Sequence, residues 1–339
     1  MTTHVFSQGL NGYPGVQTRM TSKGWEKMVD VTIGIDISKD HLDVHRLPDG
    51  KARQFANTRS GVTQFIRWIG SAPVARVVFE PTGRYHLALE RSLGTSGLPV
   101  VKVNPRQAKR FAQSLGVRAK TDRADAAMLA RMGAALMLEP QPVRPEVLQD
   151  LNDLMAARRA LVKDRTAAKN RAKQLRLTLL ARLNRMRLAR IKADLQTIDR
   201  AILEIIKADP ELQARHEILL SIAGISEVTA AAILTMMPEL GHLDRKQAAS
   251  LAGLAPVTRQ SGRWRGKAFI QGGRSALRQA LYMPAVVACR FNPDLKAKYN
   301  VLISAGKPPK LAITAIMRKL IVLANALIRD RRFWQASRT

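Results

Sequence analysis

The chain has 339 residues, of which 46% are hydrophobic and only 5% aromatic, and this length is sufficient for two or more domains with apolar cores. Lysine and arginine number 56 against 26 acidic residues, and the resulting net charge of +30 indicates a polyanionic partner, for which nucleic acid is the usual candidate. The only cysteine, Cys289, excludes an internal disulfide, and six scattered histidines show no zinc-binding spacing.

Residues 1–29 are rich in threonine, serine, glycine and glutamine, without periodicity and without the apolar core of a signal peptide. We expect a disordered leader here, or sequence upstream of the true start, for which Met28 is a natural first residue. The most apolar late stretch, residues 313–328, is interrupted by Arg318 and Lys319, so no segment is expected to span a membrane. The expected compartment is the cytoplasm.

Residues 30–140 have the pattern of an α/β domain. Apolar residues at 31, 33 and 35 alternate with small ones, as in a strand, and helical spacing of apolar residues follows Ser60. Hairpin strands followed by strand–helix alternation predict a mixed sheet with helices on its faces. The expected elements in chain order are strands over 31–36, 41–45 and 51–57, a helix capped by Ser60, a strand over 75–80, a helix over 85–93 and a strand over 98–103.

Two of these strands end in a carboxylate, Asp36 and Glu80. A buried, unpaired carboxylate costs several kcal/mol, so a divalent cation is a candidate compensator. Alternatively, Asp36 only opens the turn after its strand. Asp122 and Asp125 stand three residues apart at the start of the next helix, behind the expected N-cap Thr121, and thus on one helical face. Acidic residues in a first turn also complement the helix macrodipole, which needs no metal.

Taken together, Asp36, Glu80, Asp122 and Asp125 make a set of four carboxylates. Such a set suits two divalent cations about 4 Å apart. Oxygen ligands without histidine or cysteine select a hard cation, so the expected cofactor is Mg²⁺ or Mn²⁺.

Residues 145–208 form the next segment, a helical arm. Residues 146–180 contain no proline or glycine, which predicts one long helix, followed by a second over 182–208 that stops at Pro210. With few acids to pair its cations, the arm is expected to pair protomers as a coiled coil and to bind phosphate backbones; the alternative is a solvated strut that only holds a dimer. The expected contacts are Arg158, Arg159, Lys163, Arg165, Lys169, Arg171, Lys173 and Arg176.

Residues 211–335 are expected to be mostly α-helical. An apolar turn centred on Gly224 can present backbone N–H groups to a phosphate or serve as an ordinary helix C-cap, and helices are expected over 228–236 and 247–253. From 245 to 293 there are nine lysines and arginines and no acid. The cations expected to bind nucleic acid here are Arg259, Arg263, Arg265, Lys267, Arg274 and Arg278.

Ser261 lies among the first four of these cations, and Gly262 and Gly266 are expected to keep the loop open. A serine hydroxyl is a poor nucleophile at neutral pH, so it needs a base or a metal beside it and cations over the phosphate. A polar turn in a phosphate-binding loop explains the same residues equally well.

The order D…E…DxxD on this strand pattern resembles the RuvC-like, RNase-H-type nuclease fold. Residues 34–39, 80–83 and 120–126 are similar in detail to the DEDD insertion-sequence transposases, a family that includes Piv/MooV-type DNA invertases and bridge-RNA-guided recombinases. The resemblance covers roughly residues 28–335. Ser261 falls on the serine of the family pattern GLxPxxxxSG, which implies a covalent 5′-phosphoserine-type intermediate.

The expected protein is therefore a metal-dependent DNA transposase/recombinase of an insertion sequence. The resemblance further implies a structured guide RNA that pairs with target and donor DNA, and a homodimer or higher homo-oligomer on DNA in a prokaryotic cytoplasm, at the nucleoid when active. Two other functions remain open. In a Mg²⁺-dependent junction-resolving nuclease, water would attack and Ser261 would only bind phosphate. A non-catalytic RNA-binding protein would leave the four acids without a purpose.

Overall fold

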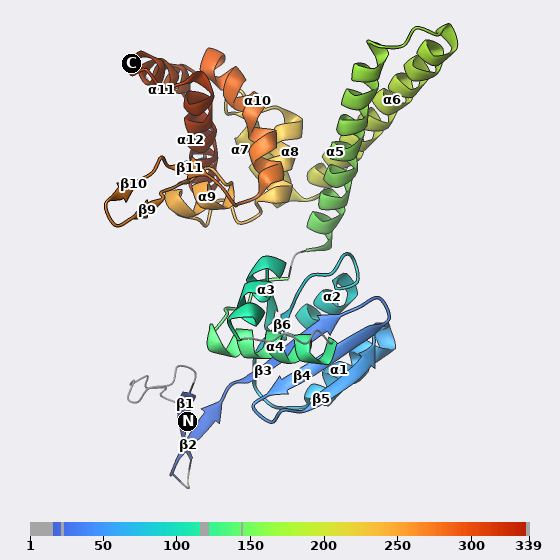
Figure 1. The fold of residues 1–339 in the computed structure, drawn as a ribbon, viewed down its shortest axis with the longest axis vertical. Coiled ribbons are helices and arrows are strands. Elements are labelled where there is room, and N and C mark those ends of the chain that lie inside the picture. Colours follow the sequence, from blue (N-terminus) through green and yellow to red (C-terminus); the bar gives the residue numbers. More distant parts are fainter. Residues whose placement is uncertain (1–15, 22–23, 116–121, 144, 337–339) are drawn as a thin grey trace. The chain divides into compact units, whose positions relative to one another are not determined.

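A computed structural model describes residues 16–21, 24–115, 122–143 and 145–336 (Figure 1). The chain divides into two compact units, residues 1–144 and 145–339, which we describe separately. The expectation of a disordered leader over residues 1–29 is wrong for residues 16–21 and 24–29. There, β1 (Val16–Thr21) and β2 (Gly24–Val29) form an antiparallel hairpin.

The first unit is built on a five-stranded mixed sheet. Its order is β5-β4-β3-β6-β7, with β3, β4 and β5 antiparallel and with β6 and β7 parallel to β3. The α/β domain with a mixed sheet that the sequence predicts over this region is thus confirmed. The strands are β3 (Val31–Ile37), β4 (His41–Leu47), β5 (Ala52–Ala56), β6 (Val74–Phe79) and β7 (Val100–Lys102).

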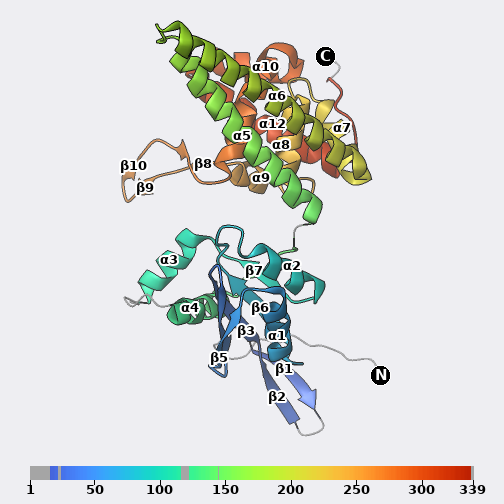
Figure 2. The same ribbon diagram turned by 90° about the vertical axis from the view of Figure 1, so that its right-hand side faces the viewer.

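Helices cover both faces of this sheet (Figure 2). On one face, Ile33 and Ile35 pack with Phe65 of α1 (Arg59–Ile69) and Leu89 of α2 (Leu87–Thr95). The other face carries α3 (Pro105–Ser114) and α4 (Asp122–Ala135), with Leu129 of α4 packed on the sheet. Successive strand residues point to opposite faces, which explains two separate cores.

Some boundaries in the first unit differ from expectation. Thr58, not Ser60, caps α1: its hydroxyl accepts a hydrogen bond from the Gly61 N–H at 3.2 Å. Strand β6 ends at Phe79, so Glu80 is the first residue after it. Helix α3 was not expected, although Asn104 followed by proline at the first helical position is a recognisable start signal.

The second unit consists of helices and a small β-ribbon. Helix α5 ends earlier and α6 begins earlier than expected, and the two pack together as a helical hairpin, the arm (Figure 1). The helices are α5 (Glu146–Ala172), α6 (Thr178–Ala208), α7 (Pro210–Leu220), α8 (Glu227–Met236), α9 (Arg245–Leu251), α10 (Ser275–Phe291), α11 (Pro293–Ser304) and α12 (Pro309–Arg329). The strands are β8 (Pro256–Val257), β9 (Gln260–Ser261), β10 (Trp264–Arg265) and β11 (Phe269–Ile270).

Helix α12 is at the centre of the second core. It is long and apolar enough to cross a membrane, yet Ile316, Leu320 and Ala324 are fully buried against neighbouring helices of this unit. The buried amide of Asn325 accepts a hydrogen bond from the Gly241 N–H at 2.8 Å and donates to the Leu243 carbonyl at 2.7 Å. The apolar composition of α12 is therefore explained by its place in the protein core.

Candidate active site and nucleic-acid interface

Asp36 and Glu80 lie at the same edge of the sheet. Strands β3 and β6 are parallel neighbours, and Ile35 is in register with Phe79. Asp36 follows Ile35 and Glu80 follows Phe79, and both carboxylate side chains are half-buried. Because the carboxyl ends of parallel neighbours meet at one edge, the sheet places these two acids at the same edge.

Helix α4 brings its first turn to this edge. A β-carbon at Gly34 would lie 2.1 Å from the Ala126 carbonyl oxygen, and one at Gly133 would lie 3.1 Å from Thr32 Cγ2. The helix therefore runs antiparallel to β3, with its N-terminal end over the carboxyl end of the strand. Gly34 and Asp36 are two residues apart in β3 and therefore point to the same face of the sheet, the face that α4 covers. Asp125 lies in the first turn of α4, at that end.

A shared edge is not yet a metal site. Among the side chains that the structure describes, no group of three or more histidines, cysteines or acids is arranged to hold a metal ion. The side chain of Asp122 lies outside the described residues, as does Thr121, its expected cap. The fold thus places Asp36, Glu80 and Asp125 at one edge of the sheet without closing them around an ion.

Asn57 links the two segments that follow Asp36 and Glu80, and sequence patterns did not single it out. Its side-chain amide donates to the Ser38 carbonyl at 2.9 Å and to the Tyr85 carbonyl at 3.2 Å. Its backbone N–H donates to the Asp40 carbonyl at 2.8 Å. Asn57 is therefore a positioning residue for both carboxylate-bearing segments. The partners are 19 and 28 residues away, so no local pattern reveals them.

A buried charge group anchors the far end of the segment after Glu80. Glu90 of α2 is only 2% exposed, and Lys102 of β7 donates to its carboxylate at 2.6 Å. His86 Nε2 lies 3.7 Å from the same carboxylate, and burial lowers the pKa of this imidazole. These contacts tie α2 to the edge strand and so fix the place where residues 81–86 end.

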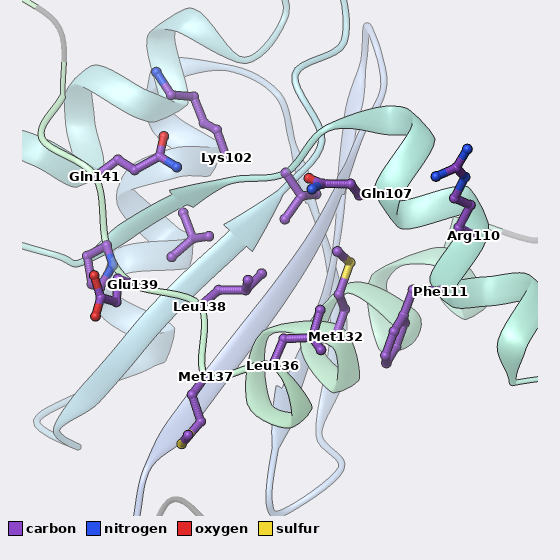
Figure 3. A pocket seen from close by; sticks show the side chains of 13 residues that line it. Lys102, Gln107, Arg110, Phe111, Met132, Leu136, Met137, Leu138, Glu139 and Gln141 are labelled. Atoms are coloured by element: carbon purple, nitrogen blue, oxygen red, sulfur yellow. The ribbon is translucent and has the colours of Figure 1, made fainter. Parts of the chain in front are cut away.

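A separate cavity of about 840 Å³ lies between α3, the end of α4 and residues 136–141 (Figure 3). Gln107 and Arg110 of α3 lie on one side, and Glu139 and Gln141 on the other. Phe111, with other apolar side chains, completes the lining. None of the residues predicted to act on nucleic acid lines this cavity.

Ser261 lies on a projecting ribbon of short strands (Figure 2). Strand β9 pairs with β10, in the register Ser261 to Trp264, and β8 pairs with β11. Gly262 has φ of 56°, as the first position of a two-residue hairpin turn requires. The open loop expected around Gly262 and Gly266 is therefore an ordered hairpin, with Ser261 exposed beside its turn.

Four cations lie within six residues of Ser261 in the ribbon segment. Arg259 stacks its guanidinium 4.5 Å from the centre of the Phe269 ring, while Arg263, Arg265 and Lys267 are exposed. Within the part of the chain that the structure describes, no carboxylate lies within ion-pair distance of these four, and no histidine or acid hydrogen-bonds to the Ser261 hydroxyl. The ribbon thus supplies positive charge for a phosphate but no local base for the serine.

Arg274 and Arg278, two of the predicted nucleic-acid contacts, hold the base of the ribbon. Arg274 makes a bidentate pair with Glu239, both contacts at 2.7 Å, and donates to the Met236 carbonyl at 2.8 Å. Arg278 donates to the carbonyls of Gly253 at 3.1 Å and Gly272 at 2.9 Å. Both guanidinium groups therefore have structural partners inside the second unit.

In the arm, too, one predicted contact has a structural partner and the others do not. Arg158 of α5 pairs with Asp199 of α6, with Nε at 2.5 Å from the carboxylate, and so fastens the two helices. Seven predicted contacts have no carboxylate within ion-pair distance among the described residues: Arg159, Lys163, Arg165, Lys169, Arg171, Lys173 and Arg176. All but the half-buried Arg165 are exposed, so the arm carries a strongly positive surface.

Two family models and several known proteins match the sequence of this chain. A family model described as a transposase matches residues 33–180, and a model of the transposase IS116/IS110/IS902 family matches residues 216–300. The pilin gene-inverting proteins of Moraxella lacunata and Moraxella bovis are each 32% identical over 317 residues, which is 88% of this chain and 96% of theirs. A 43.6 kDa protein of insertion element IS110 from Streptomyces coelicolor is 30% identical over 40% of this chain and 34% of its own length.

Among solved structures, T. thermophilus RuvC in complex with a Holliday junction substrate matches 33% of this chain and 99% of its own, with 18% identity and a TM-score of 0.24. The relatives and the family models span most of both units. They exclude the non-catalytic RNA-binding protein that the sequence left open. The chain therefore belongs to the IS116/IS110/IS902 family of transposases, enzymes that recombine DNA.

Proposed function

We propose that this protein is the transposase/recombinase of an insertion sequence and that it exchanges DNA strands through a covalent ester with Ser261. The observation that carries the proposal is the ribbon: an exposed serine beside a tight turn, among four cations that have no carboxylate partner in the described chain. Cations over a phosphate stabilise the charge that develops during attack. The family membership supplies the reaction class.

In the proposed step, the Ser261 oxygen forms a bond to the phosphorus of a DNA phosphodiester. The bond from phosphorus to the 3′ oxygen breaks, and that oxygen leaves as a hydroxyl after taking up a proton, while the serine proton is lost to a base. The product is a 5′-phosphoserine ester. Attack by a 3′ hydroxyl of another strand reverses the exchange, forms a new phosphodiester and restores the serine. The phosphoserine ester thereby conserves the energy of the broken phosphodiester bond for the rejoining step.

Asp36, Glu80, Asp122 and Asp125 are proposed to hold Mg²⁺ or Mn²⁺. An all-carboxylate set at the carboxyl edge of a sheet fits a hard cation, because it offers oxygen ligands only. When bound, such ions stabilise charge on the attacking and leaving oxygens of a phosphodiester. These four residues would be the metal ligands. Asn57 and the contact of Gly34 with α4 would hold the segments that carry them in position.

The remaining parts of the proposal concern partners. The net charge is +30, and the sequence has no homeodomain or zinc-finger motif to read DNA. A structured guide RNA that pairs with target and donor DNA would account for both facts. The arm, with seven cations lacking a carboxylate partner in the described chain, is proposed to bind phosphate backbones and to pair protomers in a homo-oligomer on DNA. The proposed site of action is the prokaryotic nucleoid.

One observation favours a second candidate function, a junction-resolving nuclease. The Ser261 hydroxyl has no base hydrogen-bonded to it among the described residues. If water is the nucleophile, the cut ends are free, and the ribbon only binds phosphate. The two functions differ in whether DNA becomes attached to protein.

The deciding experiment uses end-labelled DNA that carries the flanks of the encoding element, incubated with the full-length protein and Mg²⁺ and run on denaturing gels. We expect a protein–DNA adduct with the wild type, and neither adduct nor recombination with Ser261→Ala. Asp36→Asn and Asp125→Asn should abolish cutting while DNA binding persists, because the loss of one ligand removes several kcal/mol of charge stabilisation. Cleavage by Ser261→Ala, with no adduct in the wild type, would establish the water mechanism instead.

A further inference from the structure

Trp264 is an exposed aromatic side chain directly beside Ser261. It is 59% exposed, although tryptophan is usually well buried, and it is the cross-strand partner of Ser261 in the ribbon. Side chains of directly opposed residues in an antiparallel pair lie on the same face, with β-carbons about 5 Å apart. The Trp264 side chain therefore starts beside Ser261 on the same face of the ribbon, and its ring extends along the strand over Gly266.

The ribbon keeps space for this ring. A β-carbon at Gly266 would fall 2.3 Å from Trp264 Cη2 and 2.9 Å from Cζ2 and Cζ3, so any larger residue there would displace the indole. Gly266 has no positive φ that would itself require glycine. By contrast, Gly262 has φ of 56° and open space around it, so that glycine serves the turn. The glycine at 266 thus serves the placement of the tryptophan.

The charged residues next to Trp264 indicate the kind of ligand that its ring contacts. Arg263 and Arg265 flank it in sequence, and residues 245–293 contain no acid. Their guanidinium groups can neutralise phosphates, and within the described part of the chain no aromatic ring or cation stacks on the indole. Aromatic side chains interleaved with cations are the combination that binds a strand with unpaired bases: the cations follow the backbone, and the ring stacks on a base.

We propose that Trp264 stacks on an unpaired nucleobase beside the phosphodiester held at Ser261. In an intact duplex each base face is covered by its neighbours, so the ring favours a strand that has been separated or a base turned out of the helix. Trp264 would then select single-stranded DNA at the crossing point and hold it in place. This inference deepens the proposed function and rests on it for the identity of the adjacent phosphate.

The test measures binding of the full-length protein to two fluorescein-labelled probes, a 30-nucleotide single strand of mixed sequence and the duplex of the same sequence. Loss of one stacked base should weaken single-strand binding of Trp264→Leu by about 5- to 150-fold, and Trp264→Phe should retain much of the affinity. Duplex binding should stay within about two-fold, since phosphate contacts dominate it. Phe291→Leu, at an aromatic residue that is 71% exposed at the end of α10, is the matched control and should change neither.

A second measurement locates the contact. A single strand with 5-iodo-2′-deoxyuridine should crosslink to Trp264 under ultraviolet light, and Gly266→Ala should reduce the yield by displacing the ring. Both results are expected in the Ser261→Ala background too, so failure of the nucleophile assignment and failure of the stacking assignment can be told apart. Equal losses for single strand and duplex, or no loss with Trp264→Leu, would overturn the inference; the latter would indicate a protein surface as the partner of the ring.

Discussion

A β-carbon at Gly34 would lie 2.1 Å from the carbonyl oxygen of Ala126, closer than any real contact of this kind. The missing side chain lets the backbone of α4 rest directly on β3, and this contact carries the first turn of α4 to the edge where Asp36 lies. A clash with backbone cannot be relieved by a change of rotamer.

Gly34→Ala should therefore destabilise the first unit by about 3 kcal/mol, the upper end for overpacking. Urea denaturation followed by circular dichroism measures the change. Gly97→Ala is the control, because that glycine has φ of 68° and open space, so only backbone strain of about 1–2 kcal/mol is expected. A cost for Gly34→Ala no greater than that of the control would contradict the close contact.

Asn57 should prove more important for the active site than for the fold as a whole. Asn57→Asp keeps the shape but replaces the amide donor with a carboxylate facing the carbonyls of Ser38 and Tyr85. We expect faster hydrogen exchange at the amides of His41 and Tyr85, and a lower rate of Mg²⁺-dependent cutting. A donor removed from two acceptors costs about 1–3 kcal/mol.

The control for this variant is Gln54→Ala, which removes an exposed hydrogen bond to Asp43 on the same sheet. It should leave exchange at residues 38–41 and 82–86 unchanged. If both variants raise exchange equally, the bridge made by Asn57 has no special role.

Arg274 and Arg263 should separate structure from binding, although both lie in the same acid-free stretch. Arg274→Gln breaks the bidentate pair with Glu239 and should lower the stability of the second unit by about 1.5–3 kcal/mol. Arg263→Gln removes an exposed guanidinium and should leave stability within about 0.5 kcal/mol. If Arg263 contacts a phosphate, its loss should also reduce the slope of log K against log[salt] on duplex DNA by about 0.9. Thermal melts and salt titrations of both variants test this, and a reduced slope for Arg274→Gln would assign that residue to the interface after all.

The arm should contribute strongly to salt-dependent binding. Charge reversal of Arg171, Lys173 and Arg176 to glutamate should flatten the salt slope on a 40-base-pair duplex, by up to about 0.9 for each phosphate contact that is lost. The control reverses three exposed lysines with the same change in net charge, Lys296, Lys298 and Lys307. An unchanged slope for the arm variant would leave the arm only the role of pairing protomers.

The sequence by itself determined the features that depend on local patterns. Alternation around Ile33 and Ile35 predicted the central strand, and the sequence pattern singled out Asp36 and Glu80 as the acids at the ends of two strands. That the two share one edge of the sheet follows from the parallel register of β3 and β6. Periodicity and spacing are properties of neighbouring residues, so one chain is enough to read them. The charge of +30 likewise followed from composition alone.

Only the tertiary structure decided which of many similar residues do what. Arg274 and Arg263 look alike in the sequence, yet the first is paired with Glu239, 35 residues away. The structure singles out Trp264 because it is paired with Ser261 across the ribbon and its ring lies where a side chain at residue 266 would be. Asn57 gained its significance from two carbonyls in separate segments. A side chain's role depends on the partner that the fold brings within hydrogen-bond or van der Waals distance, and partners far apart in the chain leave no local signal.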